Sequence, residues 1–279
     1  MRDYFALCKP RIALMVVLTT ALGFSLAGGR LGPSMLWTLL GTGLSACACG
    51  TLNQYLEKEQ DALMARTRKR PLPAGRLEPA QALIFGLGLA AVGLTVLAIK
   101  SHPYALGMTA ATLVLYVLAY TPLKKVTPQT TWLGAFAGAT PPLIGWAAAS
   151  GTMPMKAWVL FAIQFLWQIP HFLAMFWMHR EDYARAGFKV MPVVDSSGGL
   201  TAFQIAIHSL SMLLASLLPS LCGMADARYG FVVLIVGTAY MVLGMKASWT
   251  LALVDTRRLF LASLAYLPLV FGLLLWGGV

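Results

Sequence analysis

Apolar stretches of about 20 residues recur along the whole chain and constrain its fold more than any other feature. Nine of them occur, at 12–28, 35–56, 80–99, 103–121, 131–150, 155–177, 201–221, 229–248 and 259–277. A helix needs about 20 apolar residues to cross the hydrocarbon of a bilayer, and a lipid-exposed backbone must pair within a helix or a closed barrel. The period-two alternation of barrel strands is absent. The sequence therefore predicts an all-α membrane protein, a bundle of about nine transmembrane helices.

Composition supports this interpretation and excludes a soluble core. Charged residues make up 11% of the chain and hydrophobic residues 58%, whereas soluble domains carry roughly 25% charged residues. The longest polar gaps, 57–79 and 178–200, are too short for a separate soluble domain. We therefore expect a single transmembrane domain over residues 1–279.

The distribution of basic residues predicts the topology. With a cytoplasmic N-terminus and nine crossings, 17 of the 21 Lys and Arg residues fall on the inner side, as the positive-inside rule requires. The net charge of +11 then reflects topology and not nucleic-acid binding. The N-terminus carries an acid and a proline before its first apolar run, unlike a cleaved leader. We expect a multi-pass protein of a bacterial inner (plasma) membrane. The four scattered cysteines predict neither a disulfide framework nor a zinc site.

The second apolar run continues into a polar segment with regularly spaced oxygen side chains. Asn53, Glu57 and Asp61 are four residues apart, so on a helix they share an arc of roughly 80°. Neighbouring carboxylates repel one another, and a cation between them would relieve that repulsion. Mg²⁺ prefers such hard oxygen ligands and commonly adds substrate phosphates. These three residues are candidate metal ligands.

A dense basic cluster follows the acidic segment. Arg66, Arg68, Lys69 and Arg70 precede Pro71, and arginine side chains match the geometry of phosphate oxygens. Acids that hold a metal beside arginines at a membrane surface indicate a site for a diphosphate with a lipid tail. The alternative is a solvated loop whose basic residues only satisfy topology and contact anionic lipid. That alternative explains the basic residues, but it does not explain why the acidic residues share one face of a helix.

The sixth apolar run carries a second polar stripe. On a continuous helix, Gln168, His171, Met175, His179 and Asp182 would lie within about 80° of one another. Polar groups inside a transmembrane helix normally face the bundle interior, so the stripe predicts a functional face. Pro170 should kink this helix.

These segments resemble a known family. The stretch N-x-x-x-E-x-x-x-D-x-x-M-x-R-T-x-x-R-P-L (53–72) resembles the first acidic motif of the UbiA-type intramembrane prenyltransferases, and its extension resembles the heme O synthase branch. W-Q-x-P-H-F (167–172), D-Y-x-x-A-G (182–187) and P-V-V (192–194) are similar to the same branch, as are YTPLKK (120–125) and GATPPLIGW (138–146). Two departures stand out. Glu57 replaces the usual aspartate, and the second aspartate-rich motif keeps Asp182 with His179 near the place of another acid.

The resemblance implies an activity and roles for individual residues. It implies transfer of a farnesyl group from farnesyl diphosphate to a vinyl group of protoheme IX (heme B), giving heme O and pyrophosphate with Mg²⁺ as cofactor. Asn53, Glu57, Asp61 and Asp182 would hold the metal, and His171 would act in catalysis. The expected substrate-binding residues are Arg66, Arg70, Lys124, Tyr120, Trp167, Gln168 and His179. Besides membrane lipids, a heme A synthase or terminal oxidase assembly proteins are the expected partners.

Two other functions remain compatible with the sequence. A related polyprenyltransferase would use another aromatic or tetrapyrrole acceptor, such as a quinone precursor or a chlorophyll-type ring. A heme or lipid transporter, from a different class, would also show broken helices and polar sites. Mg²⁺-dependent release of pyrophosphate separates the enzymes from the transporter. For Gly138 and Gly145 we expect helix packing and not chemistry.

Overall fold

The computed structural model describes residues 1–277, so the last two residues of the expected domain lie outside it. Within this range every regular element is helical, which confirms the predicted all-α class. Among the described residues, seven helical segments are long and apolar enough to cross a membrane, one of them the continuous run Pro103–Leu123. The helix α2 (Pro10–Leu26) is a shorter apolar helix of 17 residues. The protein is thus a multi-pass membrane protein, whereas the count of nine crossings and the cytoplasmic N-terminus remain predictions.

The chain divides into two compact units. The first unit comprises 1–126, 140–153 and 182–188, and the second comprises 127–139, 154–181 and 189–279. The helices of the first unit are α1 (Arg2–Leu7), α2 (Pro10–Leu26), α3 (Pro33–Leu56), α4 (Lys58–Leu63), α5 (Pro79–Lys100), α6 (Pro103–Val114), the π-helix η1 (Leu115–Tyr120), α7 (Thr121–Leu123) and α9 (Pro141–Ser150). Those of the second are α8 (Thr130–Ala139), α10 (Met155–Met178), α12 (Met191–Val194), α13 (Gly199–Leu221), α14 (Ala227–Thr250) and α15 (Leu253–Gly277). The short helix α11 (Arg180–Arg185) starts in the second unit and ends in the first.

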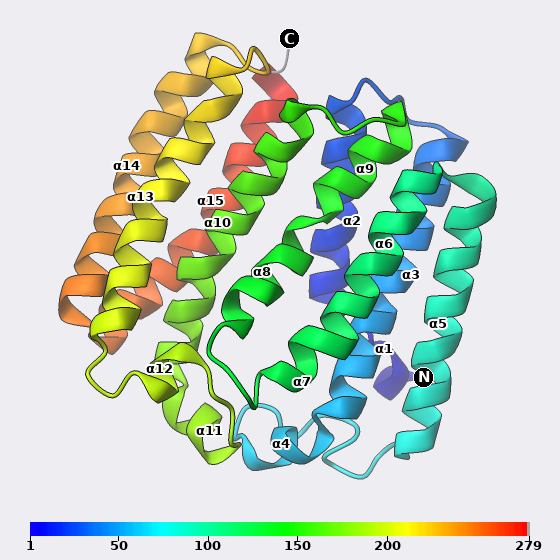
Figure 1. Ribbon diagram of the computed structural model, residues 1–279, viewed down its shortest axis with the longest axis vertical. Helices are drawn as coiled ribbons and strands as arrows, with labels where there is room; N and C mark the ends of the chain where they lie inside the picture. Colours follow the sequence, from blue (N-terminus) through cyan, green and yellow to red (C-terminus); the bar gives the residue numbers. More distant parts are fainter. Residues whose placement is uncertain (278–279) are drawn as a thin grey trace. The chain divides into compact units, whose positions relative to one another are not determined.

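Long helices pack side by side within each unit. In the first, α3 packs against α5, and α2 packs against both α3 and α9 (Figure 1). In the second, α13 packs against α10 and α14, and α15 packs against α10 and α14. Large apolar side chains also point outward, with Ile84 72% and Phe231 66% exposed. Such surfaces suit contact with lipid.

The run expected to form one span over 131–150 is divided into two helices. α8 ends at Ala139, and α9 begins with Pro141 and Pro142. Neither proline has a backbone N–H, and a proline ring clashes with the preceding helical turn, so a helix can begin there but not continue through. The division assigns α8 to the second unit and α9 to the first.

Two glycines allow α2 and α9 to approach closely. A Cβ atom on Gly145 would lie 1.9 Å from the carbonyl oxygen of Thr20, and one on Gly23 would lie 2.0 Å from that of Pro142. Backbone atoms cannot move aside as a flexible side chain can, so only glycine fits at either position. The predicted packing role of Gly145 is confirmed, and Gly138 also packs closely, against Gln168.

This contact predicts a stability difference between two glycine variants. Gly145→Ala should lower the stability by about 1–3 kcal/mol, because the added methyl group overpacks the α2–α9 contact. Gly88→Ala in α5 is the matched control, because a Cβ there has no neighbouring atom within 4 Å. Thermal unfolding in detergent measures both. Equal melting temperatures for the two variants would contradict the packing role.

Candidate active site

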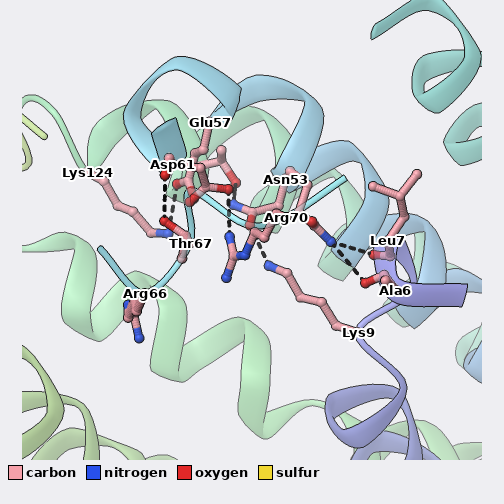
Figure 2. A network of polar contacts seen from close by, with 12 residues as sticks. Ala6, Leu7, Lys9, Asn53, Glu57, Asp61, Arg66, Thr67, Arg70 and Lys124 are labelled. Carbon is pink, nitrogen blue, oxygen red and sulfur yellow. Dashed lines mark hydrogen bonds and ion pairs between the residues drawn. The ribbon is translucent and has the colours of Figure 1, made fainter. Parts of the chain in front are cut away.

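The end of α3 and the start of α4 place Asn53, Glu57 and Asp61 close together; we call these three residues the acidic face (Figure 2). α3 ends at Leu56, so the continuous helix expected here is interrupted at Glu57. Helical backbone bonds nevertheless persist across the break, from Glu57 N to Asn53 O at 3.0 Å and from Asp61 N to Glu57 O at 2.8 Å. All three residues are buried, with exposed fractions of 1%, 4% and 2%.

Each residue of the acidic face pairs with a basic side chain from a different segment. Lys9 Nζ donates to Asn53 Oδ1 at 2.6 Å, Lys124 Nζ to Glu57 Oε1 at 2.8 Å, and an Arg70 guanidinium nitrogen to Asp61 Oδ2 at 2.6 Å (Figure 2). We refer to Lys9, Arg70 and Lys124 as the three bases. Arg70 and Lys124 balance the two carboxylates, and Lys9 bonds to the neutral amide of Asn53.

The orientation of the Asn53 amide follows from its neighbours. Thr121 Oγ1 donates its single proton to the carbonyl oxygen of Tyr116 at 2.8 Å, so it can only accept from Asn53 Nδ2, at 3.1 Å. The amide oxygen is thereby turned toward Lys9. A neutral amide oxygen thus accompanies two carboxylates, and oxygen atoms of this kind could hold a hard cation.

Hydrogen bonds to the backbone hold the segments that carry the bases. Gln54 Nε2 donates to the carbonyl oxygens of Leu7 at 2.9 Å and Ala6 at 3.3 Å, which ties the end of α1 to α3 (Figure 2). Lys9 itself has a left-handed backbone, with φ of 48°. In the loop after α4, Thr67 Oγ1 donates to the carbonyl oxygen of Asp61 at 2.8 Å. These contacts fix the approach of Lys9 and Arg70 to the acidic face.

The two lysines differ in how strongly they retain their protons. Burial and the nearby charge of Arg70 lower the pKa of Lys9 to about 7, although Glu57 opposes them. Burial also acts against charge on Lys124, but the Glu57 carboxylate outweighs it and raises the pKa of Lys124 above its usual value. Lys124 Nζ also lies 4.5 Å from the ring centre of Tyr120. Lys124 is therefore a firmly charged group with an aromatic ring beside it.

Arg66 contacts Tyr183, which directly follows Asp182 in the sequence. Its guanidinium lies over the ring of Tyr183, 5.1 Å from the ring centre, and donates to the Tyr183 hydroxyl. Tyr183 is buried, and burial raises the pKa of its hydroxyl, opposed by the charge of Arg66. The adjacent Asp182 forms an ion pair with Arg185. Arg66 and Asp182 thus belong to the same unit as the acidic face.

The other predicted site residues lie in the second unit. Gln168 Nε2 donates to the carbonyl oxygens of Ala135 and Gln164, both at 3.0 Å, and so links α10 to α8. Trp167 Nε1 donates to the carbonyl oxygen of Ser263 at 2.7 Å. His171 Nδ1 lies 2.7 Å from Ser263 Oγ. Three of the predicted residues therefore take part in packing α10 against its neighbours.

The predicted helix running from Gln168 through Asp182 is wrong at its C-terminal end. α10 ends at Met178, and His179 caps it with φ of −119° and ψ of 22°, outside the helical region. Asp182 follows in α11 and in the first unit. The five residues therefore do not form one helical stripe.

Sequence reasoning missed several residues of these sites. Lys9 was counted only toward topology, and Thr121, Tyr183 and Ser263 were given no role. The available signal for Lys9 was its position directly before a proline, next to the first apolar run. A residue in that position lies at the membrane boundary. No local signal marks Thr121 or Ser263, since their roles depend on contacts between distant segments.

Comparisons with known proteins bear on both fold and chemistry. The profile of the UbiA prenyltransferase family matches residues 16–267. A protoheme IX farnesyltransferase of Solibacter usitatus is 41% identical over 99% of this chain and 98% of its own, and one of Opitutus terrae is 39% identical over 98% and 93%.

Two solved structures share the fold at low sequence identity. A digeranylgeranylglyceryl phosphate synthase superposes with a TM-score of 0.80 at 15% identity, covering 99% of this chain and 97% of its own. A UbiA homologue from Archaeoglobus fulgidus, bound to DMAPP and Mg²⁺, gives 0.69 at 15% identity, covering 97% and 99%.

Proposed function

Because the chain belongs to the UbiA prenyltransferase family, we propose that it transfers the farnesyl group of farnesyl diphosphate to a vinyl group of protoheme IX. The products would be heme O and pyrophosphate. One observation carries this proposal: a buried acidic face, each of whose three residues is bonded to a basic side chain. Relatives named protoheme IX farnesyltransferase support the choice of donor and acceptor.

The acidic face offers the hard oxygen ligands that a magnesium ion prefers. They are the carboxylates of Glu57 and Asp61 and the amide oxygen of Asn53, whose nitrogen donates to Thr121. We propose Asn53, Glu57 and Asp61 as ligands, with Asp182 as a further one. When bound, Mg²⁺ would neutralise the diphosphate and stabilise the departing pyrophosphate. The Mg²⁺ and DMAPP bound by the Archaeoglobus fulgidus homologue are consistent with this assignment.

The three bases would exchange partners when the donor binds. Without the donor they neutralise the acidic face, and with it they would pair with the phosphate oxygens while the carboxylates turn to the metal. Arg66, held over Tyr183, would add a fourth contact to the diphosphate. Basic side chains already gathered at the site would then stabilise the charge on the leaving group.

Aromatic rings would protect the developing carbocation. The C–O bond of the donor breaks, its electron pair leaves with pyrophosphate, and an allylic cation remains. Tyr120 lies beside Lys124 in the first unit, and its ring face would stabilise positive charge. Trp167, in the second unit, is proposed to bind substrate. The vinyl group then forms the new C–C bond. Water adds to the resulting cation as a hydroxyl group and loses a proton to the solvent.

The remaining assignments concern the acceptor and the cellular setting. We propose that Gln168, His171 and His179 bind the tetrapyrrole. We also propose a single domain in a bacterial inner membrane, with a cytoplasmic N-terminus. A heme A synthase or terminal oxidase assembly proteins would receive the product.

Incubation of purified protein in detergent with heme B, farnesyl diphosphate and Mg²⁺ tests the function. Mass spectrometry should detect a hydroxyfarnesyl heme, and EDTA should abolish it. Pyrophosphate release with a different aromatic acceptor, and none with heme B, would replace the proposed acceptor. If folded protein releases no pyrophosphate with any acceptor, a transport function replaces the enzymatic one.

A further inference from the structure

A buried histidine and a buried serine meet between two transmembrane helices of the second unit. His171 lies in α10 and Ser263 in α15, with exposed fractions of 9% and 0%. The distance from His171 Nδ1 to Ser263 Oγ is 2.7 Å. Polar side chains are costly within the hydrocarbon region, so the pair requires a reason beyond packing.

The position of the histidine proton follows from the serine. Ser263 Oγ also lies 2.6 Å from the carbonyl oxygen of Phe260. A carbonyl oxygen only accepts, so the single hydroxyl proton must point to Phe260. Ser263 Oγ is then the acceptor for His171, and the histidine carries its proton on Nδ1. In the neutral ring this leaves Nε2 with a free lone pair.

Two aromatic rings stack on the imidazole of His171. The ring centre of His171 lies 4.9 Å from that of Trp167 and 4.7 Å from that of Phe260, with interplanar angles of 20° and 25°. Trp167 is itself fixed by its hydrogen bond to the carbonyl oxygen of Ser263. The two stacked rings and the bond at Nδ1 therefore hold the imidazole in place, and the structure records no partner on Nε2 within residues 1–277.

We propose that His171 Nε2 is the axial ligand of the iron in the tetrapyrrole acceptor, with Ser263 as its positioning residue. The inference rests on the proposed function, because it takes heme as the acceptor. Histidine binds metals through one ring nitrogen while the other donates to an oxygen that fixes the tautomer and raises the basicity of the ring. Ligation would anchor the flat macrocycle by its iron and leave its vinyl groups unbonded.

Spectroscopy of bound heme tests the inference without measuring catalysis. Wild-type protein should bind ferric heme more tightly than iron-free protoporphyrin IX. Its ferrous complex should show an iron–imidazole vibration that shifts when the protein is labelled with ¹⁵N-histidine. His171→Ala should lose that vibration and weaken heme binding by more than about 100-fold, beyond the effect typical of an outer partner. Added imidazole should restore the vibration in this variant.

His208 supplies a matched control. It lies in α13 of the same unit, and its Nδ1 donates to the carbonyl oxygen of Gln204 at 2.9 Å, so it has the same tautomer. Within residues 1–277 the one ring recorded near it is that of Trp132, at 6.3 Å between centres, and no pair of stacked rings flanks it. His208→Ala should therefore leave the heme spectrum unchanged. Loss of the signal in this variant, and not in His171→Ala, would overturn the assignment.

Ser263→Ala separates positioning from structural support. The ligand remains, so the iron–imidazole vibration should persist but move to lower frequency as the imidazole loses basicity, with heme binding about 10-fold weaker. An unchanged frequency would contradict the role of Ser263. Equal wild-type affinity for heme and iron-free protoporphyrin, or a ¹⁵N-insensitive spectrum, would overturn iron ligation itself, even if a variant fails to fold.

The outcomes also separate this inference from the proposed function. Formation of hydroxyfarnesyl heme without a histidine signal would retain the function and reject the ligation. A histidine-ligated heme without any farnesyl transfer would retain the ligation and reject the function.

Discussion

Replacement of Asp61 by asparagine is expected to reduce prenyl transfer about 100- to 1,000-fold, the loss typical when one preorganised electrostatic contact to a developing charge is removed. The same loss is expected for Glu57→Gln. Each substitution preserves the size of the side chain but removes the negative charge that the proposed metal site needs. Initial rates of pyrophosphate release, measured at saturating donor and Mg²⁺, give the effect.

Glu59→Gln is the matched control for both variants. Glu59 lies in α4 between the two acids of the acidic face, but its side chain is exposed. Its substitution should leave the rate within about twofold of wild type, since an exposed charge contributes little. Circular dichroism should show that all three variants retain their helices. Wild-type turnover in a folded Glu57→Gln or Asp61→Asn variant would rule out the metal site.

The second large effect is expected at Lys124. Lys124→Met should raise the KM for farnesyl diphosphate and lower kcat, with a combined loss of about 100-fold in kcat/KM, because a buried charge that would pair with the leaving phosphate is removed. The substitution also leaves the buried Glu57 without its base. Rates over a range of donor concentrations separate the two kinetic constants.

Lys125 provides the neighbouring control. Its side chain is exposed, whereas that of Lys124 is only 12% exposed. Lys125→Met therefore removes the same charge from the same loop without touching the acidic face. Equal losses in the two variants would show that the net charge of the loop matters, and not the pairing with Glu57.

The sequence predicted the local part of the first site. Glu57 and Asp61 lie four residues apart on consecutive turns, and helical periodicity alone brings them together. Arg70 follows within the same segment, so the sequence also predicted that it lies near these acids. Lys9 is 44 residues from its partner Asn53, and Thr121 is 68 residues away. Contacts over such separations depend on how whole helices pack, which periodicity does not encode.

The second polar stripe was predicted wrongly because helical periodicity assumes an unbroken helix. The spacing from Gln168 to Asp182 fits one helical face only if the helix continues, and α10 ends at Met178. The non-helical turn at His179 changes the direction of the chain, so later side chains no longer follow the periodicity of α10. Asp182 consequently belongs to the other unit. Ser263 illustrates a further limit, because a serine in an apolar helix carries no sign of its partner. The nearby histidine reveals its role only once the two helices are packed.

The pairs of the acidic face also imply an order of assembly during synthesis. Chains emerge from the ribosome with the N-terminus first, so Lys9 is already present when Asn53 appears, and Arg70 follows Asp61 by only nine residues. Lys124 follows Glu57 by 67 residues, after α5 and α6 have been made. Until then Glu57 has no base and resists burial in a low-dielectric environment. The site can close only after this helical hairpin has inserted, so completion of the acidic face reports insertion of α5 and α6.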